Sequence, residues 1–331
     1  MKAIVWTRYG PPDVLELQQV ERPQPKAGEI LIRIRATTVT AGDCEMRALD
    51  MQFLLALAMR AWIGWLRPRL TTIPGTELAG EVQAVGEGVT GFKVGDKVFG
   101  SAGMSLGTNA EYICLPAESS GGGASLAAMP ANMTFEQAAT VPFGGRDALH
   151  FLRQAGLQSG ERILINGAGG SIGTFAVQLA KRLGGDVTAV DRGDKLDLLR
   201  SLGSDHVIDY TEQDFADSGR TYHAIFDVVG TLSLPSIRRS IRPSGILLLA
   251  NPQPAQMFGA LRYRLTGGPN VVLSPASGTV ADLVSLAELI EAGRLRTVID
   301  RNFPLEDIVE AHQYVETGAK QGHVVITIDE E

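Results

Sequence analysis

The sequence "RILINGAGGSIGTFAVQLAKRLGG" (residues 162–185) places a glycine-rich turn between an apolar run and a helical pattern. Counted back from its last glycine, the turn reads Ala168-x-Gly170-x-x-Gly173, a spacing typical of a strand that leads into a dinucleotide-binding helix. Backbone N–H groups and the helix N-terminus attract a pyrophosphate there, and Gly173 allows close helix–strand packing. The alternative is a chance turn without a ligand. The predicted cofactor loop consists of Ala168, Gly169, Gly170, Ser171, Ile172 and Gly173.

An acidic residue about 20 positions after such a turn, at the end of the next strand, bonds the adenosine ribose. Asp191 ends the run "DVTAVD" (186–191) and occupies that position. Its carboxylate favours NADH, because it accepts from the ribose 2′-hydroxyl and repels a 2′-phosphate. Arg192 follows it directly and favours NADPH, since a guanidinium binds phosphate through paired hydrogen bonds.

Strand and helix patterns alternate after the turn. The later strands are "HVIDY" (206–210), "HAIFDVVG" (223–230) and "GILLLAN" (245–251). Alternation of this kind predicts an α/β fold with a parallel sheet and helices on both faces.

The chain before residue 118 has a different pattern. Short β-branched runs such as "EILIRIRATTV" (29–39) are broken by Gly and Pro, which predicts a mostly-β unit. Residues 118–130 are predicted to be a loop, and a helix begins at Thr134, where Gln137 completes a capping box.

The two patterns predict two domains, as the length of 331 residues also suggests. We expect one domain from residues 1–125 together with 275–331, where two amphipathic helices and a last strand "HVVITI" complete the chain. Residues 126–274 form the other.

Composition excludes several classes of protein. The net charge is −7, which is unlike the basic balance of a nucleic-acid-binding protein. Cys44 and Cys114 stand far apart, so no disulfide framework and no metal spacing is indicated. The N-terminus "MKAIVWTRYG" lacks the features of a signal peptide, and a cytoplasmic location is expected.

Residues 51–66, "MQFLLALAMRAWIGWL", contain a single charge at Arg60. The run is too short to span a bilayer, which needs about 20 apolar residues. We expect a helix that covers a substrate cleft or forms a subunit contact. Peripheral membrane contact is the less favoured alternative, because the apolar residues surround the helix and do not oppose a basic face.

At this point the chain resembles a known family. The stretches "MKAIVWTRYGPPDVLEL" (1–17), "IPGTELAGEVQAVGEGVTGFKVGDKVFG" (73–100) and "FPLEDIVEAHQYVETGAKQGHVVITI" (303–328) are similar to the medium-chain dehydrogenase/reductase superfamily, in its zinc-independent quinone oxidoreductase branch. The turn at 168–173 and "LGSDHVIDY" (202–210) match its cofactor domain. The resemblance implies a GroES-like, mostly-β substrate domain, a doubly wound Rossmann cofactor domain, and a homodimer.

The resemblance also bears on metal content. Zinc-dependent relatives hold a cysteine and a histidine where this sequence has Thr40 and Thr76, and the third ligand, near "PFGG", is missing as well. Threonine hydroxyls are poor zinc ligands beside thiolates and imidazoles, and the five histidines show no metal-ligand spacing. No zinc is therefore expected. Conjugated carbonyls suit a metal-free reductase, because hydride addition spreads the negative charge over the conjugated system.

Three residues are candidates for the catalytic site. Thr40 and Asp43 occupy positions that line the family's substrate cleft, where Thr40 could donate to a substrate oxygen and Asp43 could instead cap a helix. Relatives often read "PFGGLTAL", whereas this chain reads "PFGGRDAL". That difference places Asp147 at the nicotinamide, where a carboxylate would favour the oxidised, positively charged ring. Pairing with Arg146 or another cation, without a catalytic part, is the alternative role for Asp147.

The residues expected around the adenosine ribose favour different cofactors. Lys195 and Tyr210 match positions that hold the 2′-phosphate in NADPH-specific relatives, and with Arg192 they outweigh Asp191. NADPH is therefore favoured over NADH. Losing Lys195 is expected to weaken NADPH binding, and Asp191→Ser to improve it. Val229 and Asn251, which follow later strands, complete the expected cofactor site.

The sequence thus predicts an NAD(P)H-dependent, metal-free reductase that transfers hydride to a quinone or another conjugated carbonyl. Two alternatives remain: a zinc-independent alcohol or aldehyde dehydrogenase of the same fold, and a nucleotide-binding partner protein with little turnover. No tyrosine lies within 41–60, so a proton donor is not identified.

Overall fold

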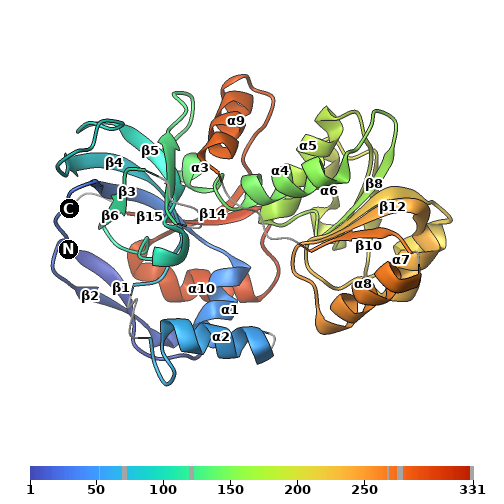
Figure 1. Cartoon of the computed structure of the whole chain (residues 1–331), viewed down its shortest axis with the longest axis horizontal. Coiled ribbons are helices and arrows are strands. Elements are labelled where there is room, and N and C mark those ends of the chain that lie inside the picture. The colour runs from blue at the N-terminus through green and yellow to red at the C-terminus, as the bar shows by residue number, and fades with distance from the viewer. Residues whose placement is uncertain (52, 69–72, 119–122, 267, 274–278, 329–331) are drawn as a thin grey trace. The chain divides into compact units, whose positions relative to one another are not determined.

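The computed structural model describes residues 1–331 except 52, 69–72, 119–122, 267, 274–278 and 329–331 (Figure 1). The chain divides into two compact units. The first comprises Met1–Phe143 with Ser277–Glu331, and the second comprises Gly144–Ala276.

The first unit is built mainly of β-strands. A seven-stranded sheet has the order β14-β15-β3-β4-β5-β7, with β6 also paired to β3, and β1 and β2 form a separate hairpin (Figure 1). The strands are β1 (Lys2–Trp6), β2 (Leu15–Gln19), β3 (Glu29–Val39), β4 (Glu77–Val85), β5 (Lys97–Ser101), β6 (Tyr112–Pro116), β7 (Ser125–Ala128), β14 (Ile299–Pro304) and β15 (His323–Thr327).

Helices complete this unit around the sheet. They are α1 (Ala41–Ala48), α2 (Phe53–Ile63), α3 (Phe135–Ala139), α9 (Val280–Glu291) and α10 (Ile308–Glu316), with short 3-10 turns η1 (Pro12–Val14), η2 (Gly103–Ser105) and η5 (Leu305–Asp307). β3 is the organising strand, because it pairs with β4, β6 and β15 and buries Ile30, Ile32 and Ile34 completely. The β-branched run expected to form a strand therefore lies at the centre of the core.

The first boundary between the units lies between residues 143 and 144, whereas the sequence predicted it between residues 125 and 126. β7 lies within the segment predicted to be a loop, yet it pairs antiparallel with β5. α3 begins after the Thr134 capping box, as predicted, and contacts β3 and β4. These contacts hold residues 125–143 in the first unit. The second expected boundary, 274/275, lies outside the described residues.

The second unit contains a six-stranded parallel sheet. Its strands are β8 (Arg162–Asn166), β9 (Asp186–Asp191), β10 (His206–Asp209), β11 (Tyr222–Asp227), β12 (Ile241–Leu249) and β13 (Asn270–Val272). The spatial order β10-β9-β8-β11-β12-β13 is the doubly wound order 3-2-1-4-5-6. The predicted fold class is confirmed, and the strand order reverses between β8 and β11.

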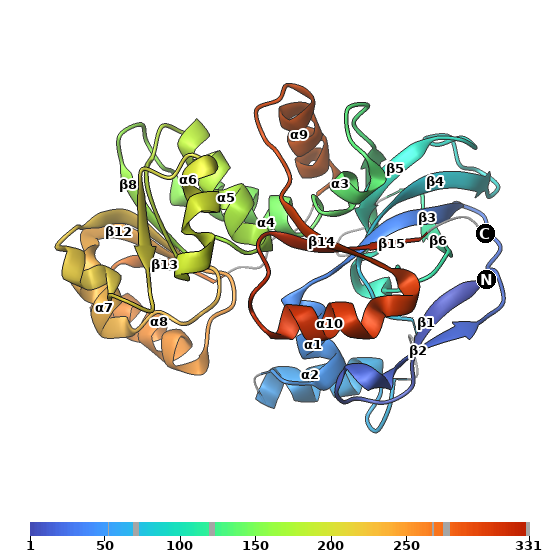
Figure 2. The same ribbon diagram turned by 180° about the vertical axis from the view of Figure 1, so that it is seen from behind.

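Helices cover both faces of this sheet. α4 (Gly144–Ala155), α5 (Ser171–Arg182) and α6 (Leu196–Ser201) lie on one side, and α7 (Leu234–Ser240) and α8 (Pro254–Thr266) on the other (Figures 1 and 2). Short turns η3 (Gly193–Lys195) and η4 (Phe215–Ser218) complete the connections. Within the parts of the chain that the structure describes, no helix combines the length and hydrophobicity of a membrane span. Ligands of such sheets bind beyond the carboxyl ends of the strands, where the order reverses.

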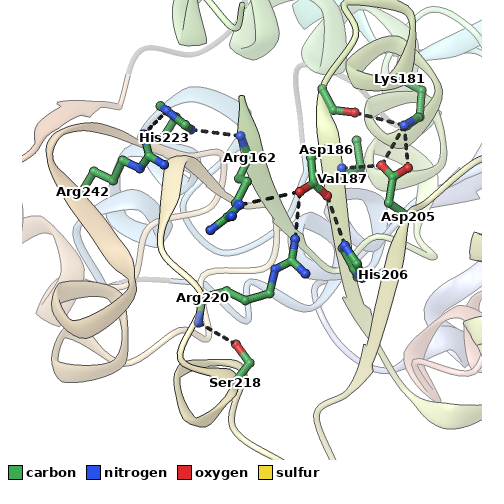
Figure 3. A network of polar contacts seen from close by, with 11 residues as sticks. Arg162, Lys181, Asp186, Val187, Asp205, His206, Ser218, Arg220, His223 and Arg242 are labelled. Carbon is green, nitrogen blue, oxygen red and sulfur yellow. Dashed lines mark hydrogen bonds and ion pairs between the residues drawn. The ribbon is translucent and has the colours of Figure 1, made fainter. Parts of the chain in front are cut away.

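The opposite edge, where the strands begin, holds a charged network (Figure 3). Asp186, the first residue of β9, accepts from Arg220 at 2.8 Å and lies 3.2 Å from Nε2 of His206, the first residue of β10. Asp205 accepts from Lys181 at 2.7 Å and from the N–H of Val187 at 2.8 Å. These bonds join neighbouring strands at the amino edge of the sheet and stabilise it there. The glycine-rich turn lies at the opposite, carboxyl edge.

Candidate functional site: the carboxyl edge of the parallel sheet

The glycine-rich turn joins the end of β8 to the start of α5. Gly167 has a φ of +77°, which favours glycine, and Gly170 is the N-cap of α5. The first N–H groups of a helix have no acceptor within it, and Gly170 brings no side chain to accept from them. This helix end is thus suited to an anionic group such as a pyrophosphate.

Gly173 lets α5 lie against the turn. A Cβ added there would stand 2.3 Å from the carbonyl oxygen of Gly167 and 2.5 Å from the Cα of Ala168. At Gly170 the corresponding distance to Gly167 O is 3.5 Å, an ordinary contact. Ala168 and Ile172 are buried beneath the turn. Ser171 is the first residue of α5, so residues 168–170 belong to the turn and residues 171–173 to the first turn of the helix.

Asp191 holds this turn from the end of β9. Its Oδ2 accepts from the N–H of Gly169 at 2.7 Å, and its Oδ1 accepts from the N–H of Arg192 at 2.9 Å. The Lys195 Nζ lies 3.3 Å from Oδ1, and both side chains are about 7% exposed. The carboxylate is therefore engaged inside the protein. The sequence could place Asp191 near the ribose, but it gave no sign that Lys195 neutralises its charge.

The other two residues expected to hold a phosphate, Arg192 and Tyr210, reach the surface. The Arg192 guanidinium makes two hydrogen bonds to Asp194, at 2.7 and 3.2 Å, and lies at the surface. Tyr210 is also exposed, and its N–H donates to the carbonyl oxygen of Asp191 at 3.2 Å. The second unit thus brings Asp191, Arg192, Lys195 and Tyr210 together at the ends of β9 and β10. Exposed ion pairs contribute little stability, so Arg192 can exchange Asp194 for another anion.

A buried carboxylate that the sequence analysis missed lies at the reversal point. Asp227, the last residue of β11, is fully buried. It accepts from the side-chain amides of Asn166 at 2.9 Å and Gln256 at 2.7 Å, and from the N–H groups of Gly230 at 2.9 Å and Leu232 at 3.0 Å. An acid at the end of the apolar run "AIFD" was the available signal. Asp227 fixes the loop that follows β11.

Val229 lies in that loop and is exposed beyond the carboxyl edge. The loop runs close to the one after β12: the Asn251 side chain donates to the carbonyl oxygen of Val228 at 3.1 Å. A Cβ on Gly230, whose φ is +74°, would lie 2.0 Å from the carbonyl oxygen of Asn251. Val229 and Asn251 therefore lie in two adjacent loops at this edge.

Thr40 and Asp43 begin α1 in the first unit. The Thr40 hydroxyl donates to Asp43 Oδ2 at 2.6 Å, and the N–H of each residue donates to the other's side chain. This is a complete capping box, the structural alternative considered for Asp43. Burial raises the pKa of Asp43, and the hydrogen bonds from Thr40 oppose that shift. In this arrangement the Thr40 hydroxyl donates to Asp43, so donation to a substrate oxygen would require that hydrogen bond to be exchanged.

Asp147 lies in the first turn of α4. Burial raises the pKa of its carboxyl from 3.8 to about 6, against the opposing effect of Arg146. A carboxylate that titrates this close to neutrality is typical of functional sites, although structural acids can shift as well. Arg146 lowers this pKa, as the alternative of pairing would require, but burial has the larger effect.

Cysteine and histidine supply no evident nucleophile or metal site. Burial raises the pKa of Cys44 to about 12, and that of Cys114 to about 11. The Cys44 Sγ lies 3.3 Å from Nδ1 of His312, whose pKa burial lowers to about 3. Across the described residues, no cluster of three His, Cys, Asp or Glu side chains could hold a metal ion.

Comparisons with known proteins agree with this architecture. Residues 26–139 match the family described as "Alcohol dehydrogenase GroES-like domain", and residues 202–326 match "Zinc-binding dehydrogenase". Among solved structures, the quinone oxidoreductase from Coxiella burnetii aligns with a TM-score of 0.86 and 27% identity, covering 99% of each chain.

Two curated relatives are similar over almost the whole chain. The "2-methylene-furan-3-one reductase" of Solanum lycopersicum is 30% identical, over 98% of this chain and 79% of that protein. The "Quinone oxidoreductase" of Pseudomonas aeruginosa is 31% identical, over 98% of this chain and 99% of that protein. The chain belongs to the medium-chain dehydrogenase/reductase superfamily, and within it to the nicotinamide-dependent oxidoreductases of the quinone oxidoreductase type.

Proposed function

We propose that this oxidoreductase reduces a quinone or another conjugated carbonyl, with NADPH as the hydride donor and without zinc. The observation that supports it most directly is the turn at 167–173, where the N-terminus of α5 has no side-chain cap. Asp191 accepts from the Gly169 N–H of this turn and is itself contacted by Lys195. Threonine at positions 40 and 76 supports a metal-free reaction.

The residues of the second unit would divide the work of binding. Amides at the start of α5 bind the pyrophosphate, and Lys195 cancels the charge of Asp191 that would repel a 2′-phosphate. Arg192, whose side chain is 37% exposed, and the exposed Tyr210 contact that phosphate. Asp227 keeps Val229 and Asn251 in place at the reversal of the strand order. The nicotinamide, when bound, supplies the hydride.

Asp147 would act through its charge. Hydride donation leaves a positive charge on the nicotinamide ring, and an ionised carboxylate beside the ring lowers the free energy of that product. With a pKa of about 6, Asp147 is mostly ionised at neutral pH. The rate of reduction should therefore rise with pH through this range.

Steady-state oxidation of NADPH and NADH against quinones, enones, enals and simple aldehydes tests the proposal. Turnover of the conjugated substrates with NADPH is expected. Oxidation of alcohols or reduction of simple aldehydes alone would favour the alcohol dehydrogenase alternative. Cofactor binding without turnover of any substrate would favour a nucleotide-binding partner protein.

Zinc content is a separate prediction. Protein purified without added zinc should contain well under one zinc per chain, and activity should survive incubation with a chelator, because the side chains at positions 40 and 76 are hydroxyls. Elemental analysis and an assay before and after chelation measure both. Activity that a chelator removes and zinc restores would disprove the metal-free mechanism.

Cofactor choice can be tested with two substitutions that keep side-chain shape. Lys195→Met keeps the alkyl chain over Gly169 but leaves the Asp191 charge unneutralised, so NADPH affinity should fall by roughly 10- to 150-fold, and NADH affinity by less. Asp191→Asn keeps an oxygen for the Gly169 N–H and removes the negative charge that would repel a 2′-phosphate, so NADPH binding should be retained or improved.

The structure also changes one expectation from the sequence. Asp191→Ser should weaken both cofactors, because the shorter side chain cannot accept from the Gly169 N–H and the carboxylate 3.3 Å from Lys195 Nζ is lost. Fluorescence titration of both cofactors measures these effects. If Lys195→Met changes neither affinity while Asp191→Asn selectively weakens NADH, the enzyme uses NADH.

Asp147→Asn should stabilise the protein at neutral pH. The folded state raises the pKa of this carboxyl from 3.8 to about 6, so its ionisation costs stability progressively as pH rises through that window. Removing the charge should increase the free energy of unfolding by about 1–3 kcal/mol at about pH 7.5, and by little at about pH 4.

Urea unfolding at the two pH values measures this effect, with the exposed Asp13→Asn as a control that should change neither. The same Asp147→Asn variant should lose the rise in turnover near pH 6. Stabilisation without any change in the pH–rate profile would make Asp147 a structural acid only.

A further inference from the structure

Glu77, the first residue of β4, is a buried carboxylate of the first unit that the sequence analysis did not single out. It is only 1% exposed. Its Oε1 accepts from the N–H of Phe143 at 2.6 Å, and its Oε2 accepts from the hydroxyl of Thr38, on β3, at 2.5 Å. These partners lie 66 and 39 positions away along the chain. One side chain thus joins the end of β3, the start of β4 and the last residue of the unit.

The backbone that carries Glu77 is itself held in place. The Thr37 hydroxyl donates to the Glu77 carbonyl oxygen at 2.7 Å and contacts the Thr108 hydroxyl at 2.9 Å. Gly75, two residues earlier, has a φ of +94°, and a Cβ there would stand 2.4 Å from Thr108 Oγ1. β4 also pairs antiparallel with both β3 and β5 (Figure 1). Because the strand is fixed, its carboxylate can hold Phe143 at a defined place.

Phe143 directly precedes the helix that carries Asp147. It is the last residue of the first unit, and α4 begins at Gly144 with Asp147 in its first turn. Two glycines, Gly144 and Gly145, follow Phe143, and glycine leaves the backbone more conformational freedom than any other residue. The hydrogen bond from Phe143 to Glu77 therefore restricts the chain just where it enters this first turn.

Stability alone is a poor reason for an acid at this place. Burying a carboxylate is costly, and an apolar side chain of similar volume often serves the stability of a core equally well. An apolar side chain cannot supply the two hydrogen bonds, in which Thr38 orients the carboxylate and the carboxylate holds the Phe143 N–H. The position of the chain before α4 is therefore the property that depends on Glu77.

We propose that Glu77 is a positioning residue for hydride transfer, which sets the place of Asp147 by holding Phe143. The inference rests on the proposed function, in which the Asp147 carboxylate stabilises the charge that hydride donation leaves on the nicotinamide. A displacement of about 1 Å in a group that acts on the reacting atoms can lower a rate by about 100-fold. Glu77 acts through Asp147 and needs no contact of its own with cofactor or substrate.

Glu77→Ala on the full chain removes both hydrogen bonds. The single-turnover rate of NADPH oxidation by a conjugated carbonyl should fall at least about 10-fold, because Asp147 is displaced. NADPH affinity should be unchanged, since the turn at 167–173 is not touched. A loosened first turn of α4 admits water to Asp147, so the midpoint of the pH–rate profile should move from about 6 towards 3.8.

Two further variants serve as controls. Glu77→Gln keeps an oxygen for the Phe143 N–H and places an amide group opposite Thr38, so it should keep most of the rate and the same midpoint. Glu81→Ala removes a half-buried carboxylate from the same strand and should change neither property. Urea unfolding shows whether each variant keeps its fold.

Hydrogen exchange at the Phe143 amide supplies a readout that needs no turnover. Exchange should be faster in Glu77→Ala and in Thr38→Val, which keeps the side-chain volume and removes only the hydroxyl. If Glu77→Ala does not fold, Thr38→Val carries the test, and its hydride-transfer rate should fall by a smaller factor.

A folded Glu77→Ala protein that is less stable but keeps its rate and its pH midpoint would overturn the proposal. So would a Thr38→Val protein with unchanged exchange and rate. Absence of turnover by the unaltered protein would overturn the proposed function and this role with it, whereas normal turnover there beside an unaffected Glu77→Ala would overturn only the role of Glu77.

Discussion

Gly173→Ala is expected to lower the affinity for NADPH by about 100-fold, which corresponds to about 3 kcal/mol. The added methyl would stand 2.3 Å from the Gly167 carbonyl oxygen and 2.5 Å from the Ala168 Cα. Both contacts are with backbone, so the turn itself must move away from α5. Because that turn supplies the amides proposed to bind the pyrophosphate, a displaced turn cannot bind it. Overpacking of this kind should also lower stability by about 1–3 kcal/mol.

Two further glycines separate the possible causes. Gly170→Ala introduces a Cβ that meets Gly167 O at 3.5 Å, so stability should be kept, but the methyl enters the space where we expect the pyrophosphate. Gly91→Ala meets nothing within 4 Å and has an ordinary φ, so it should change neither property. Urea unfolding and fluorescence titration with NADPH measure the set. Full NADPH affinity in both Gly170→Ala and Gly173→Ala would remove the turn from the cofactor site.

Asp227→Ala should destabilise the protein by about 3–5 kcal/mol, because it leaves buried donors without their charged acceptor. The carboxylate accepts four hydrogen bonds, from the Asn166 and Gln256 side chains and from the N–H groups of Gly230 and Leu232. The Asn166 and Gln256 amides also donate to Thr231 Oγ1 and to the carbonyl oxygen of Leu232, each at 3.1 Å, so the N–H groups of Gly230 and Leu232 lose most when the carboxylate is removed. The loop with Val229 should lose its fixed position, so cofactor affinity should fall as well.

Asp227→Asn keeps one acceptor oxygen and should give an intermediate loss. Asp197→Ala is a suitable control, since its side chain is 97% exposed and its pair with Arg200 contributes little. Denaturant unfolding at neutral pH measures the three variants. An Asp227→Ala protein as stable as the unaltered chain would show that the four bonds contribute nothing net, contrary to their burial and geometry.

Local sequence patterns were sufficient to predict much of the secondary structure of the second unit. The run "RILIN", the turn and the following helix are contiguous, and their geometry depends on neighbours within a few residues. The Thr134 capping box was predicted for the same reason, because Thr134 and Gln137 are three positions apart. Strand β7 was missed, since a strand of four residues among glycines acquires its identity only by pairing with β5.

The sequence by itself determined the two-part architecture, the alternation of strands and helices from β8 to β12, and the position of Asp191 at the end of the second strand, whereas α8 and β13 were not predicted. Each of these depends on periodicity or on a short motif. Tertiary structure decided which partners the carboxylates of Asp191 and Asp227 bind. Asp191 meets Gly169, 22 positions away, and Asp227 meets Asn166, 61 positions away. Burial then sets the Asp147 pKa near 6. Solvent access and long-range contacts fix these properties, and neither exists before the chain has folded.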